Sequence, residues 1–320
     1  MVSRLLMTIL VVAVGWLPGV GHAQGLRISY SGLSGQNLPY WVTYEAGLYK
    51  KYGLSTEIVL ISGGLTNIQA MMANEIAFSY LGGSSPIQAI VQGADLVILA
   101  TAYGLMPYGV IASKNIHAPA ELKGKRIAVS RLGGIEETAA RVALDQLGVG
   151  AKNVTFLQAG PDPVRIAAVE SGAAQATMLA PPALFAATAR GLNMLADLGS
   201  LKIKYPTSVI PARRSYLTQN RPVAKKFLMA MVEGIQLYRQ NKTFAVQVLQ
   251  KYTKQTNPEI LSQTYDYFSK NTPAMPLTDP AAIQAALQSD KPTNRKAEEF
   301  YDNSILDELA REGFTKTLSK

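Results

Sequence analysis

The sequence contains no cysteine, and its 320 residues include only two histidines, His22 and His117. Without cysteine the chain has no disulfide bonds, thiolate metal sites, thiol nucleophiles or lipid-modified N-terminal cysteine. His22 lies in a segment that we expect to be removed, which leaves one histidine, too few for a metal site built from several histidines. We therefore expect neither a metal nor a cofactor.

Runs of basic charge are also missing. Lys and Arg number 31 against 22 Asp and Glu, a net charge of +9, but the basic residues are dispersed along the chain. Nucleic-acid-binding arms concentrate such residues, so nucleic acid is not an expected partner. A modest, dispersed basic excess suits a small anionic ligand or an anionic membrane surface.

No apolar run reaches the roughly 20 residues that a membrane-spanning helix needs. The apolar stretch Leu5 to Leu17 follows Arg4 and precedes the small-residue site Gly21-His22-Ala23. This order is typical of a cleaved secretory signal, and the stretch is short for a membrane anchor. We predict that residues 1–23 are a signal peptide and that the mature chain, from Gln24, is periplasmic. A cysteine-free exported chain fits that compartment.

The sequence carries an internal repeat with a period near 98 residues. The segment Arg27 to Gly35 matches Arg126 to Gly134 at an offset of 99, sharing Arg-Ile and then Ser, Leu and Gly. A second set matches 98 residues apart, in which Ile68, Ala70, Met71, Ile76, Leu81, Ala89 and Gly93 correspond to Ile166, Ala168, Val169, Ala174, Leu179, Ala187 and Gly191. Either match could arise by chance, but two in the same order favour two lobes of similar topology. The period is too long for a solenoid.

Each lobe is predicted to alternate strands and helices, which implies mostly parallel sheets with helices on both faces. The first lobe is expected to have strands at 26–31, 55–61, 76–81 and 96–101 and helices at 39–51, 66–74 and 86–92. The second is expected to have strands at 126–130, 154–157 and 174–179 and helices at 136–147, 163–171 and 183–190. The fold class is therefore α/β, with two doubly wound lobes.

Two further apolar strands, 108–113 and 207–210, are predicted to cross between the lobes. After them the chain becomes helical, with helices expected at 222–240, 243–252, 258–268, 280–288 and 296–311. This tail is expected to return to the first lobe, so that Phe300, Leu306 and Leu309 form core. The predicted boundaries are 24–109 plus 208–320 for lobe I and 110–207 for lobe II.

Small polar residues follow the predicted strands, where ligands bind in open parallel sheets. Glycine admits backbone amides close to a ligand, serine adds hydroxyl donors and helix N-termini favour anions. Each loop alone could be an ordinary turn, but together they indicate a site. The candidate ligand-binding residues of these loops are Ser34, Gln36, Asn37, Gly64, Gly83, Ser84, Ser85, Gly133 and Gly134.

Three larger side chains are also candidates. Tyr40 and Trp41 follow the first loop and could enclose an apolar ligand body, although ordinary packing of the first helix explains them equally well. Arg131 occupies the loop position at which the first lobe has Gly32, and could clamp an anion with two hydrogen bonds. The alternative for Arg131 is a solvated surface arginine. His117 is expected at the surface.

The sequence offers no catalytic constellation. The glycine-rich loops match neither the Gly-x-x-x-x-Gly-Lys-Ser/Thr pattern nor Gly-x-Gly-x-x-Gly. Glu136 and Glu137 lie at the start of a helix and not in a strand-end loop, and no nucleophile is paired with a base. We therefore expect that the chain is not an enzyme.

Several segments together resemble a known family. They are Pro39-Tyr40 to Gly47-Leu48-Tyr49, Tyr52-Gly53-Leu54, Gly63-Gly64, Ala73 to Phe78, Leu122 to Val129 and Ser130-Arg131-Leu132-Gly133, together with Gly191. They are similar to substrate-binding proteins of bacterial ABC importers of the sulfonate, nitrate and taurine type, a group often labelled NMT1/THI5-like. The resemblance covers residues 26–240.

The resemblance implies a type II periplasmic-binding fold with a hinged cleft, a small anionic or heteroaromatic ligand and an ABC permease as partner. The chain is then the periplasmic solute-binding component of an importer, expected to be a monomer, and captures a small organic anion such as a sulfonate or carboxylate. One alternative is an enzyme resembling the thiamine-pyrimidine synthase; that synthase depends on a cysteine-rich motif, which this chain lacks. Another is a ligand sensor that docks on a chemoreceptor or kinase.

Overall fold

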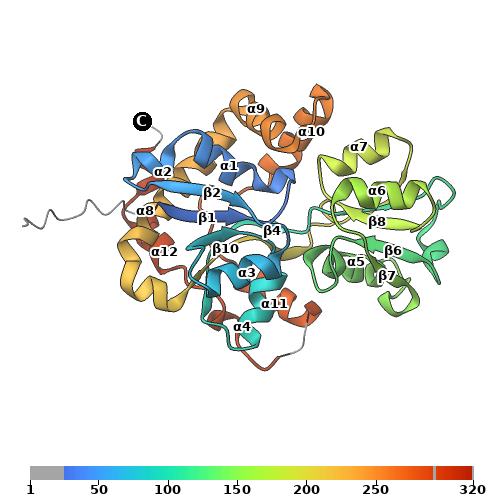
Figure 1. The fold of residues 1–320 in the computed structure, drawn as a ribbon, viewed down its shortest axis with the longest axis horizontal. Coiled ribbons are helices and arrows are strands. Elements are labelled where there is room, and N and C mark those ends of the chain that lie inside the picture. Colours follow the sequence, from blue (N-terminus) through green and yellow to red (C-terminus); the bar gives the residue numbers. More distant parts are fainter. Residues whose placement is uncertain (1–24, 291–292, 319–320) are drawn as a thin grey trace, which may run out of the picture.

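The computed structural model describes residues 25–290 and 293–318, without the side chains of residues 289 and 290. The predicted signal peptide, residues 1–23, lies outside the described residues. Figure 1 shows a larger and a smaller body side by side. We call the larger body, formed by both ends of the described chain, the first lobe, and the smaller body, formed by its middle, the second lobe.

The first lobe is built on a three-stranded and a two-stranded sheet, which adjoin each other. Its strands are β1 (Leu26–Tyr30), β2 (Thr56–Leu60), β3 (Phe78–Tyr80), β4 (Leu96–Leu105) and β10 (Lys204–Arg213). β1 pairs in parallel with β2 and β3, whereas β4 and β10 pair antiparallel. Reciprocal backbone hydrogen bonds between Leu81 and Val209 join β10 to the end of β3. β3 is buried along its whole length and β4 and β10 along most of theirs, as strands covered by helices on both faces must be.

The second lobe has one sheet in the order β7-β6-β8-β5-β9. These strands are β5 (Gly109–Ala112), β6 (Arg126–Val129), β7 (Thr155–Gln158), β8 (Ala176–Leu179) and β9 (Asn193–Asp197). β6 pairs in parallel with β7 and β8, and β5 runs antiparallel to β8 and β9. The first residue of β5 therefore lies at the same edge as the last residue of β8.

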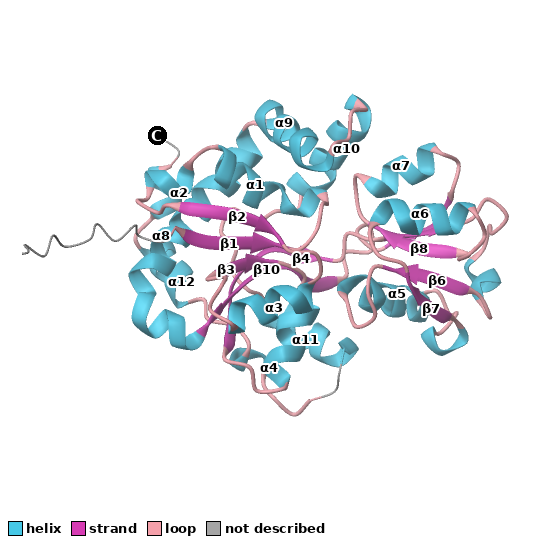
Figure 2. Cartoon of the chain, viewed as in Figure 1, coloured by secondary structure: helices cyan, strands magenta, loops and turns pink. Residues whose placement is uncertain are grey.

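Helices cover both sheets (Figure 2). The helices of the βα units are α1 (Leu38–Glu45), α2 (Leu48–Lys51), α3 (Gly64–Met72), α4 (Ser84–Val91), α5 (Ile135–Gln146), α6 (Asp162–Glu170) and α7 (Ala183–Ala189). The tail contains α8 (Arg214–Gln240), α9 (Lys242–Thr253), α10 (Pro258–Ser269), α11 (Pro280–Asp290), α12 (Ser304–Arg311) and α13 (Phe314–Thr317). Within the described ranges, none of these helices combines the length and apolar composition that crossing a membrane requires.

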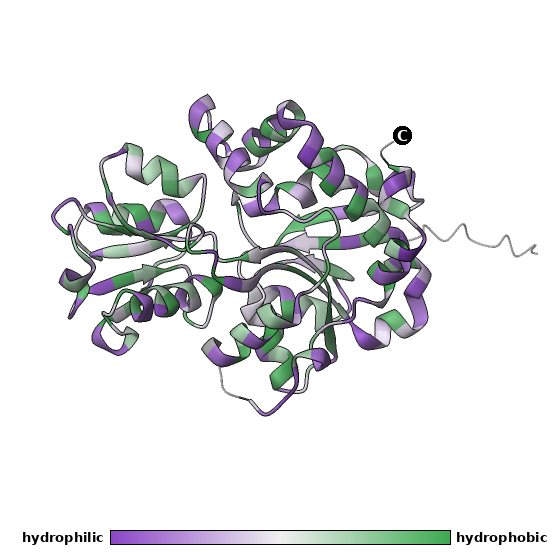
Figure 3. Cartoon of the chain, turned by 180° about the vertical axis from the view of Figure 1, so that it is seen from behind, coloured by the Kyte–Doolittle hydropathy of each residue, from purple (hydrophilic) through white to green (hydrophobic). Residues whose placement is uncertain are grey.

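The tail packs on the first lobe, as the sequence predicts. Phe227 of α8 stacks on Phe78 of β3 with ring centroids 4.2 Å apart. Phe300, Leu306 and Leu309 are fully buried, which confirms that they belong to the core. Figure 3 shows hydrophobic residues along the strands and hydrophilic residues mainly on helices and loops. Burial of these apolar side chains is the main force that holds the tail in place.

Three predicted helices differ from the structure, and one strand was not predicted. The helix predicted at 39–51 is two helices, because Gly47 adopts a left-handed conformation with φ of 67° between α1 and α2. The helix predicted at 222–240 begins at Arg214, with a kink at Asn220 before Pro222. The helix predicted at 296–311 is a 3-10 helix, Ala297–Glu299, followed by α12, because residues 300–302 between them form backbone hydrogen bonds with Ile98 of β4. β9 is a strand that the sequence analysis missed.

Two segments connect the lobes. Residues 106–108 link β4 to β5, and residues 198–203 link β9 to β10. They hydrogen-bond to each other, because Met106 N donates to Ile203 O at 3.1 Å and Leu198 N donates to Tyr108 O at 2.9 Å. Paired crossing segments of this kind form a natural hinge, since a few residues can absorb the rotation of one lobe against the other.

A buried side-chain network fixes the strand ends of the first lobe. Asn67 Oδ1 accepts hydrogen bonds from Ser29 Oγ at 2.7 Å and Ser79 Oγ at 2.9 Å. Its Nδ2 donates to Ile61 O at 2.6 Å and Gly63 O at 2.8 Å. The side chain of Asn67 is fully buried. One residue of α3 thus ties the loop after β2 to the ends of β1 and β3.

We expect that Asn67→Ala lowers the free energy of unfolding by about 3 kcal/mol, because it leaves buried hydroxyl and carbonyl groups without partners. Chemical denaturation followed by circular dichroism measures the change. Asn115→Ala, at an exposed turn, is the matched control and should change the same free energy by less than about 0.5 kcal/mol. Equal effects of the two substitutions would show that the Asn67 network contributes nothing to the stability of the fold.

Candidate ligand-binding site between the lobes

The carboxyl ends of the parallel strands in the two lobes face each other. Figure 2 shows the arrows of β1 and β2 ending toward the second lobe and that of β8 ending toward the first. In sheets of this type the carboxyl edge is where ligands bind. We call the surface at which these two edges meet the interlobe junction.

Three close approaches join the loops of the two lobes at the interlobe junction. Gly35 N of the first lobe donates to Pro181 O of the second at 2.9 Å. A Cβ atom placed on Gly82 would lie 3.1 Å from Cβ of Ile135, and one on Gly63 would lie 3.2 Å from Cζ of Arg131. The lobes are therefore in contact across the interlobe junction, as in a closed conformation.

The first lobe contributes buried polar groups to this region. Tyr80 Oη, at the end of β3, donates to Gln36 O at 2.8 Å, which fixes the loop after β1. Among the described residues, the buried side-chain oxygens that find no hydrogen-bond partner include Gln36 Oε1, Ser84 Oγ and Thr207 Oγ1. Buried polar groups without partners are costly. Oxygens of this kind are candidates for contact with a bound molecule.

The second lobe contributes an ion pair between a buried arginine and a partly exposed aspartate. Arg165 of α6 is 2% exposed, and its guanidinium donates to Asp162 Oδ1 at 2.5 Å and to Gly160 O at 2.7 Å. It also donates to Thr177 Oγ1 at 3.3 Å and to Met178 O at 3.2 Å. Arg165 therefore joins the start of α6 to β8.

The side chain of Asp162 is largely surrounded by protein but remains accessible to solvent. Its side chain is 30% exposed. Burial nevertheless raises the pKa of the Asp162 carboxyl above its usual value, and the positive charge of Arg165 opposes this shift. A charged group in such a position is accessible to a ligand and is only partly hydrated.

Glu136, in the first turn of α5, lies at the same edge. Its Oε2 accepts a hydrogen bond from Ser130 Oγ, just after β6, at 2.6 Å. The neighbouring Glu137 points elsewhere, because its Oε2 accepts from Gly133 N at 2.7 Å and its Oε1 accepts from Arg141. The chain's own carboxylates thus occupy the positive N-terminal end of α5.

Tyr108 connects these groups. It precedes β5, whose first residue pairs with Leu179 at the end of β8, so Tyr108 lies at the carboxyl edge of the second sheet. Burial raises the pKa of the Tyr108 hydroxyl well above its ordinary value, and the negative charge of Glu136 raises it further. The charge of Arg165 and a hydrogen bond with Gln36 oppose this shift in the pKa. The pKa of the Tyr108 hydroxyl therefore depends on charged and polar side chains of both lobes.

We call Gln36, Tyr108, Glu136, Asp162 and Arg165 the interlobe cluster. Of these five residues, only Gln36 was predicted from the sequence as a ligand-binding residue. Two signals were available in the sequence: the spacing of Asp162 and Arg165 places them on one face of a helix that follows a strand, and Glu136 follows a glycine pair that ends a strand-end loop. Tyr108 carried no signal beyond its place in a crossing segment.

The other predicted loop residues lie at or behind the interlobe junction in structural roles. Ser34 Oγ accepts from Gln36 N at 3.4 Å, and Asn37 Nδ2 donates to Gly32 O at 2.6 Å, so both stabilise their own loop. Close approaches leave no room for a side chain at two of the glycines. A Cβ on Gly64 would lie 2.2 Å from Ser85 Oγ, and one on Gly83 would lie 2.2 Å from Pro206 O. Gly133 has a φ of 74°, and Gly134 is the N-cap of α5.

Arg131 bridges the lobes at the edge of the interlobe junction. Its guanidinium packs against Gly63, and its Nη1 donates to Thr66 Oγ1 at 3.4 Å. The residue is partly exposed. These contacts differ from the solvated alternative, because they join the second lobe to the first. A role for Arg131 as an anion clamp stays a prediction.

Tyr40 and Trp41 make core contacts, which agrees with the packing alternative. Both are fully buried. Trp41 stacks on Tyr252 with ring centroids 4.5 Å apart and meets Tyr30 edge-on at 5.6 Å. The Tyr40 ring lies 5.0 Å from that of Tyr80. The expectation that the Trp41 face lines a ligand site is not supported by this geometry, because the face of its ring is taken by Tyr252 of the helical tail.

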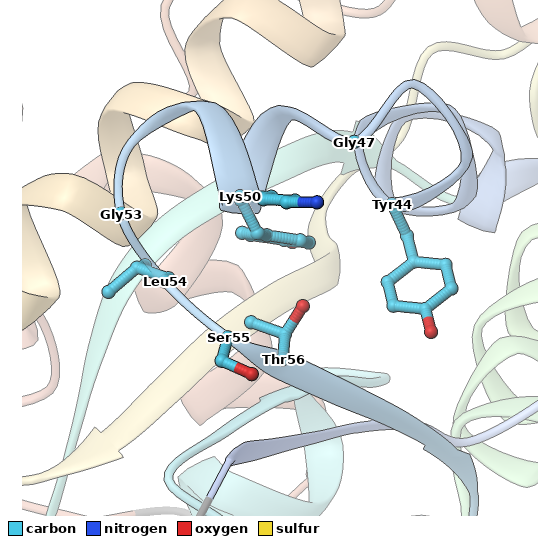
Figure 4. Close-up of a pocket in the computed structure, with 8 residues that line it drawn as sticks. Tyr44, Gly47, Lys50, Gly53, Leu54, Ser55 and Thr56 are labelled. Atoms are coloured by element: carbon cyan, nitrogen blue, oxygen red, sulfur yellow. The ribbon is translucent and has the colours of Figure 1, made fainter. Parts of the chain in front are cut away.

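Two surface pockets lie away from the interlobe junction. One, of about 440 Å³, is shown in Figure 4 between Tyr44, Lys50, Leu54 and Thr56. Thr56 begins β2, so this pocket lies at the amino end of the strand. The other, of about 1010 Å³, is lined by residues that include Lys125 and Gln175, which precede β6 and β8. Both pockets are on edges opposite the carboxyl ends, and neither contains residues of the interlobe cluster.

Comparison with solved structures identifies the fold. A protein from Bordetella bronchiseptica RB50 superimposes with a TM-score of 0.80 at 17% identity, covering 90% of this chain and 98% of that one. The alkanesulfonate-binding protein SsuA from Xanthomonas axonopodis pv. citri, solved bound to MOPS, has a TM-score of 0.70 at 20% identity, with 82% and 90% coverage. The chain has the periplasmic-binding-protein fold, which confirms the α/β fold class predicted from the sequence.

Sequence comparison agrees with the structural one. A protein of Brucella abortus (strain 2308), provisionally named a binding protein, is 24% identical over 253 residues, 76% of each chain. The family model described as NMT1/THI5 like matches residues 35–243 of this sequence. That range runs from the loop after β1, through the whole second lobe and both crossing segments, into the tail. The chain therefore belongs to the NMT1/THI5-like family.

Proposed function

We propose that this chain is the exported solute-binding component of an ABC importer, and that it holds a small organic molecule between its lobes for delivery to a membrane permease. We propose that the lobes divide at the two connecting segments, 106–108 and 198–203, a few residues before the boundaries predicted from the sequence at 109/110 and 207/208. In this proposal the chain acts as a monomer in the periplasm and performs no chemistry on its ligand.

The observation that carries this proposal is the interlobe cluster. Gln36 comes from the first lobe, Tyr108 from the hinge, and Glu136, Asp162 and Arg165 from the second lobe. Polar groups assembled from two bodies around a hinge can bind a molecule in the closed state and release it when the lobes part. A site of this kind couples binding to a change in shape, which a permease can read.

The relatives support the same function. The printed descriptions of two solved structures of this fold name an alkanesulfonate-binding protein and a periplasmic nitrate-binding protein. A third is described as the ligand-binding component of an ABC-type import system from Staphylococcus aureus. Sulfonates and nitrate are anions, and the sequence of this chain also predicts an anionic or heteroaromatic ligand.

Native mass spectrometry tests the function. We expect that protein purified gently from the periplasm of its own source carries a bound small molecule, and that denaturation, dialysis and refolding remove it. Deleting the gene should then abolish uptake of the identified molecule, and restoring the gene should recover uptake. A bound molecule whose uptake is unaffected by the deletion would contradict the importer role and favour a sensor.

A further inference from the structure

The N-terminus of α5 is already neutralised by the chain. The partial positive charge of a helix N-terminus ordinarily favours a bound anion. Here Glu136 and Glu137 lie in the first turn of α5, and Glu137 accepts the hydrogen bond of Gly133 N. A ligand anion placed at this helix end would meet the carboxylate of Glu136 and the Glu137–Arg141 ion pair.

The guanidinium of Arg165 is also committed within its own lobe. Four of its N–H donors are directed at Asp162, Gly160 O, Thr177 and Met178 O. Arg165 therefore balances the charge of Asp162 and structures α6. It is not a free clamp for a ligand anion, because an incoming anion would have to displace an internal partner.

Other cations are scarce in the strand-end loops of the interlobe junction. In residues 31–37, 62–64, 82–85, 130–135 and 159–162 the sequence has a single basic residue, Arg131. Arg131 packs across the edge of the interlobe junction on Gly63 and reaches Thr66. With Arg165 balancing Asp162, the carboxylate of Glu136 leaves the interlobe cluster with net negative charge.

The interlobe cluster presents acceptors that have no donor. Among the described residues, no hydrogen bond reaches Glu136 Oε1 or Asp162 Oδ2, whose sister oxygens bind Ser130 and Arg165. Gln36 Oε1 is buried and likewise without a partner there. Acceptors of this kind are satisfied by N–H donors, and most strongly by donors that carry positive charge.

We propose that the solute presents a nitrogen group with several N–H donors, such as a protonated amine or an amidine, to Glu136, Asp162 and Gln36. This inference rests on the proposed function, since it assumes that a solute binds between the lobes. It replaces the small organic anion expected from the sequence with a ligand whose recognition group is a hydrogen-bond donor. Tyr108 lies beside that group, and its hydroxyl remains protonated in the closed state.

Two probes of nearly equal shape and opposite charge test the inference. Benzamidine carries a planar cationic N–H group, and benzoate carries a planar carboxylate on the same ring. We expect that the mature chain, freed of retained solute by denaturation and refolding, binds benzamidine at least about tenfold more tightly than benzoate in isothermal titration calorimetry, a ratio within the range for hydrogen bonds to charged groups.

Two variants test whether the preference for benzamidine over benzoate arises from Glu136. Glu136→Gln should weaken benzamidine binding by about tenfold and leave benzoate binding unchanged or stronger. Glu75→Gln, which removes one negative charge at an exposed position after α3, should alter neither affinity. Circular dichroism melting of both variants shows whether each is folded at the titration temperature.

The outcomes separate this inference from the proposed function. Tighter binding of benzoate, equal or absent binding of both probes, or a folded Glu136→Gln variant with unchanged benzamidine affinity overturns the inference. None of these results removes the importer role, because that role depends on the molecule retained in the periplasm and its uptake. If deleting the gene leaves uptake of the retained molecule unaffected, the proposed function is overturned even if benzamidine binds.

Discussion

Replacing Arg165 with methionine is expected to lower the free energy of unfolding by about 3 to 5 kcal/mol, the range for breaking a buried ion pair by removing one partner. The guanidinium is 2% exposed and donates to four groups of the second lobe. Methionine fills much of the same volume but donates no hydrogen bond. The substitution removes the Arg165 donor from the carbonyls of Gly160 and Met178, from the buried hydroxyl of Thr177 and from the Asp162 carboxylate.

A matched substitution in the same lobe separates this effect from the loss of positive charge alone. Arg190 pairs with Glu170 at 2.7 Å, but its side chain is 57% exposed. Arg190→Met should therefore change the free energy of unfolding by less than about 1 kcal/mol, as for exposed ion pairs. Urea denaturation of both variants makes the comparison. Similar losses from the two substitutions would show that Arg165 is no more important than a surface residue.

The partner of Arg165 offers a second check. If the two side chains act as a unit, the double variant Asp162→Asn/Arg165→Met should be less destabilised than the sum of the single variants, by about 0.5 to 3 kcal/mol. Additive effects would mean that Arg165 stabilises the lobe through the carbonyls of Gly160 and Met178 and not through Asp162.

The lobes of the fold could be predicted because periodicity and repetition are properties of sequence. The match between residues 27–35 and 126–134 predicts two βα units of like topology, and the structure has β1 and β6 there. Helix boundaries were less predictable. Gly47 could have continued or ended a helix, and only its left-handed conformation between α1 and α2 decides this.

The candidate site was predictable in place but not in chemistry. Strand-end loops indicate where ligands bind, and Gln36 and Ser84 of those loops have buried oxygens without partners at the interlobe junction. The charged side chains of the interlobe cluster belong to residues just outside these loops, in the first turns of α5 and α6. Whether each charge is available to a ligand depends on pairing: Arg165 is neutralised by Asp162, whereas the side chain of Glu136 is bonded, within the described residues, only to a hydroxyl.

The aromatic residues show a second limit of sequence reasoning. The position of Trp41 in the sequence, just after the first loop, is equally compatible with a ring that faces a ligand and with a ring that faces the core. Its burial is decided by Tyr252, which lies more than 200 residues further along and stacks on it. No local pattern could have revealed that contact, because it depends on where the helical tail returns.

An engineered disulfide across the interlobe junction is expected to lock the lobes together. A Cβ on Gly82 would lie 3.1 Å from Cβ of Ile135, slightly closer than the about 3.8 Å typical of a disulfide. Gly82 is not among the glycines with positive φ, so cysteine is compatible with its backbone. The chain contains no other cysteine to compete. Gly82→Cys/Ile135→Cys should therefore oxidise in high yield in the closed conformation.

The lock should abolish exchange of solute while leaving the binding groups intact, because neither substituted residue belongs to the interlobe cluster. The single variants Gly82→Cys and Ile135→Cys, treated with the same oxidant, are the controls, and both should exchange solute as the unmodified chain does. Failure of the double variant to form the bond under oxidising conditions would mean that these two loops do not meet in solution.

The most direct test of binding between moving lobes is the release of solute from this locked protein. The double variant is oxidised in periplasmic extract of the source organism and dialysed, and the bound small molecule is then quantified by mass spectrometry before and after reduction. Our account predicts that the oxidised protein keeps its solute through dialysis and releases it once the disulfide is reduced. Loss of solute at the same rate from oxidised and reduced protein, or the absence of any bound solute, would contradict it.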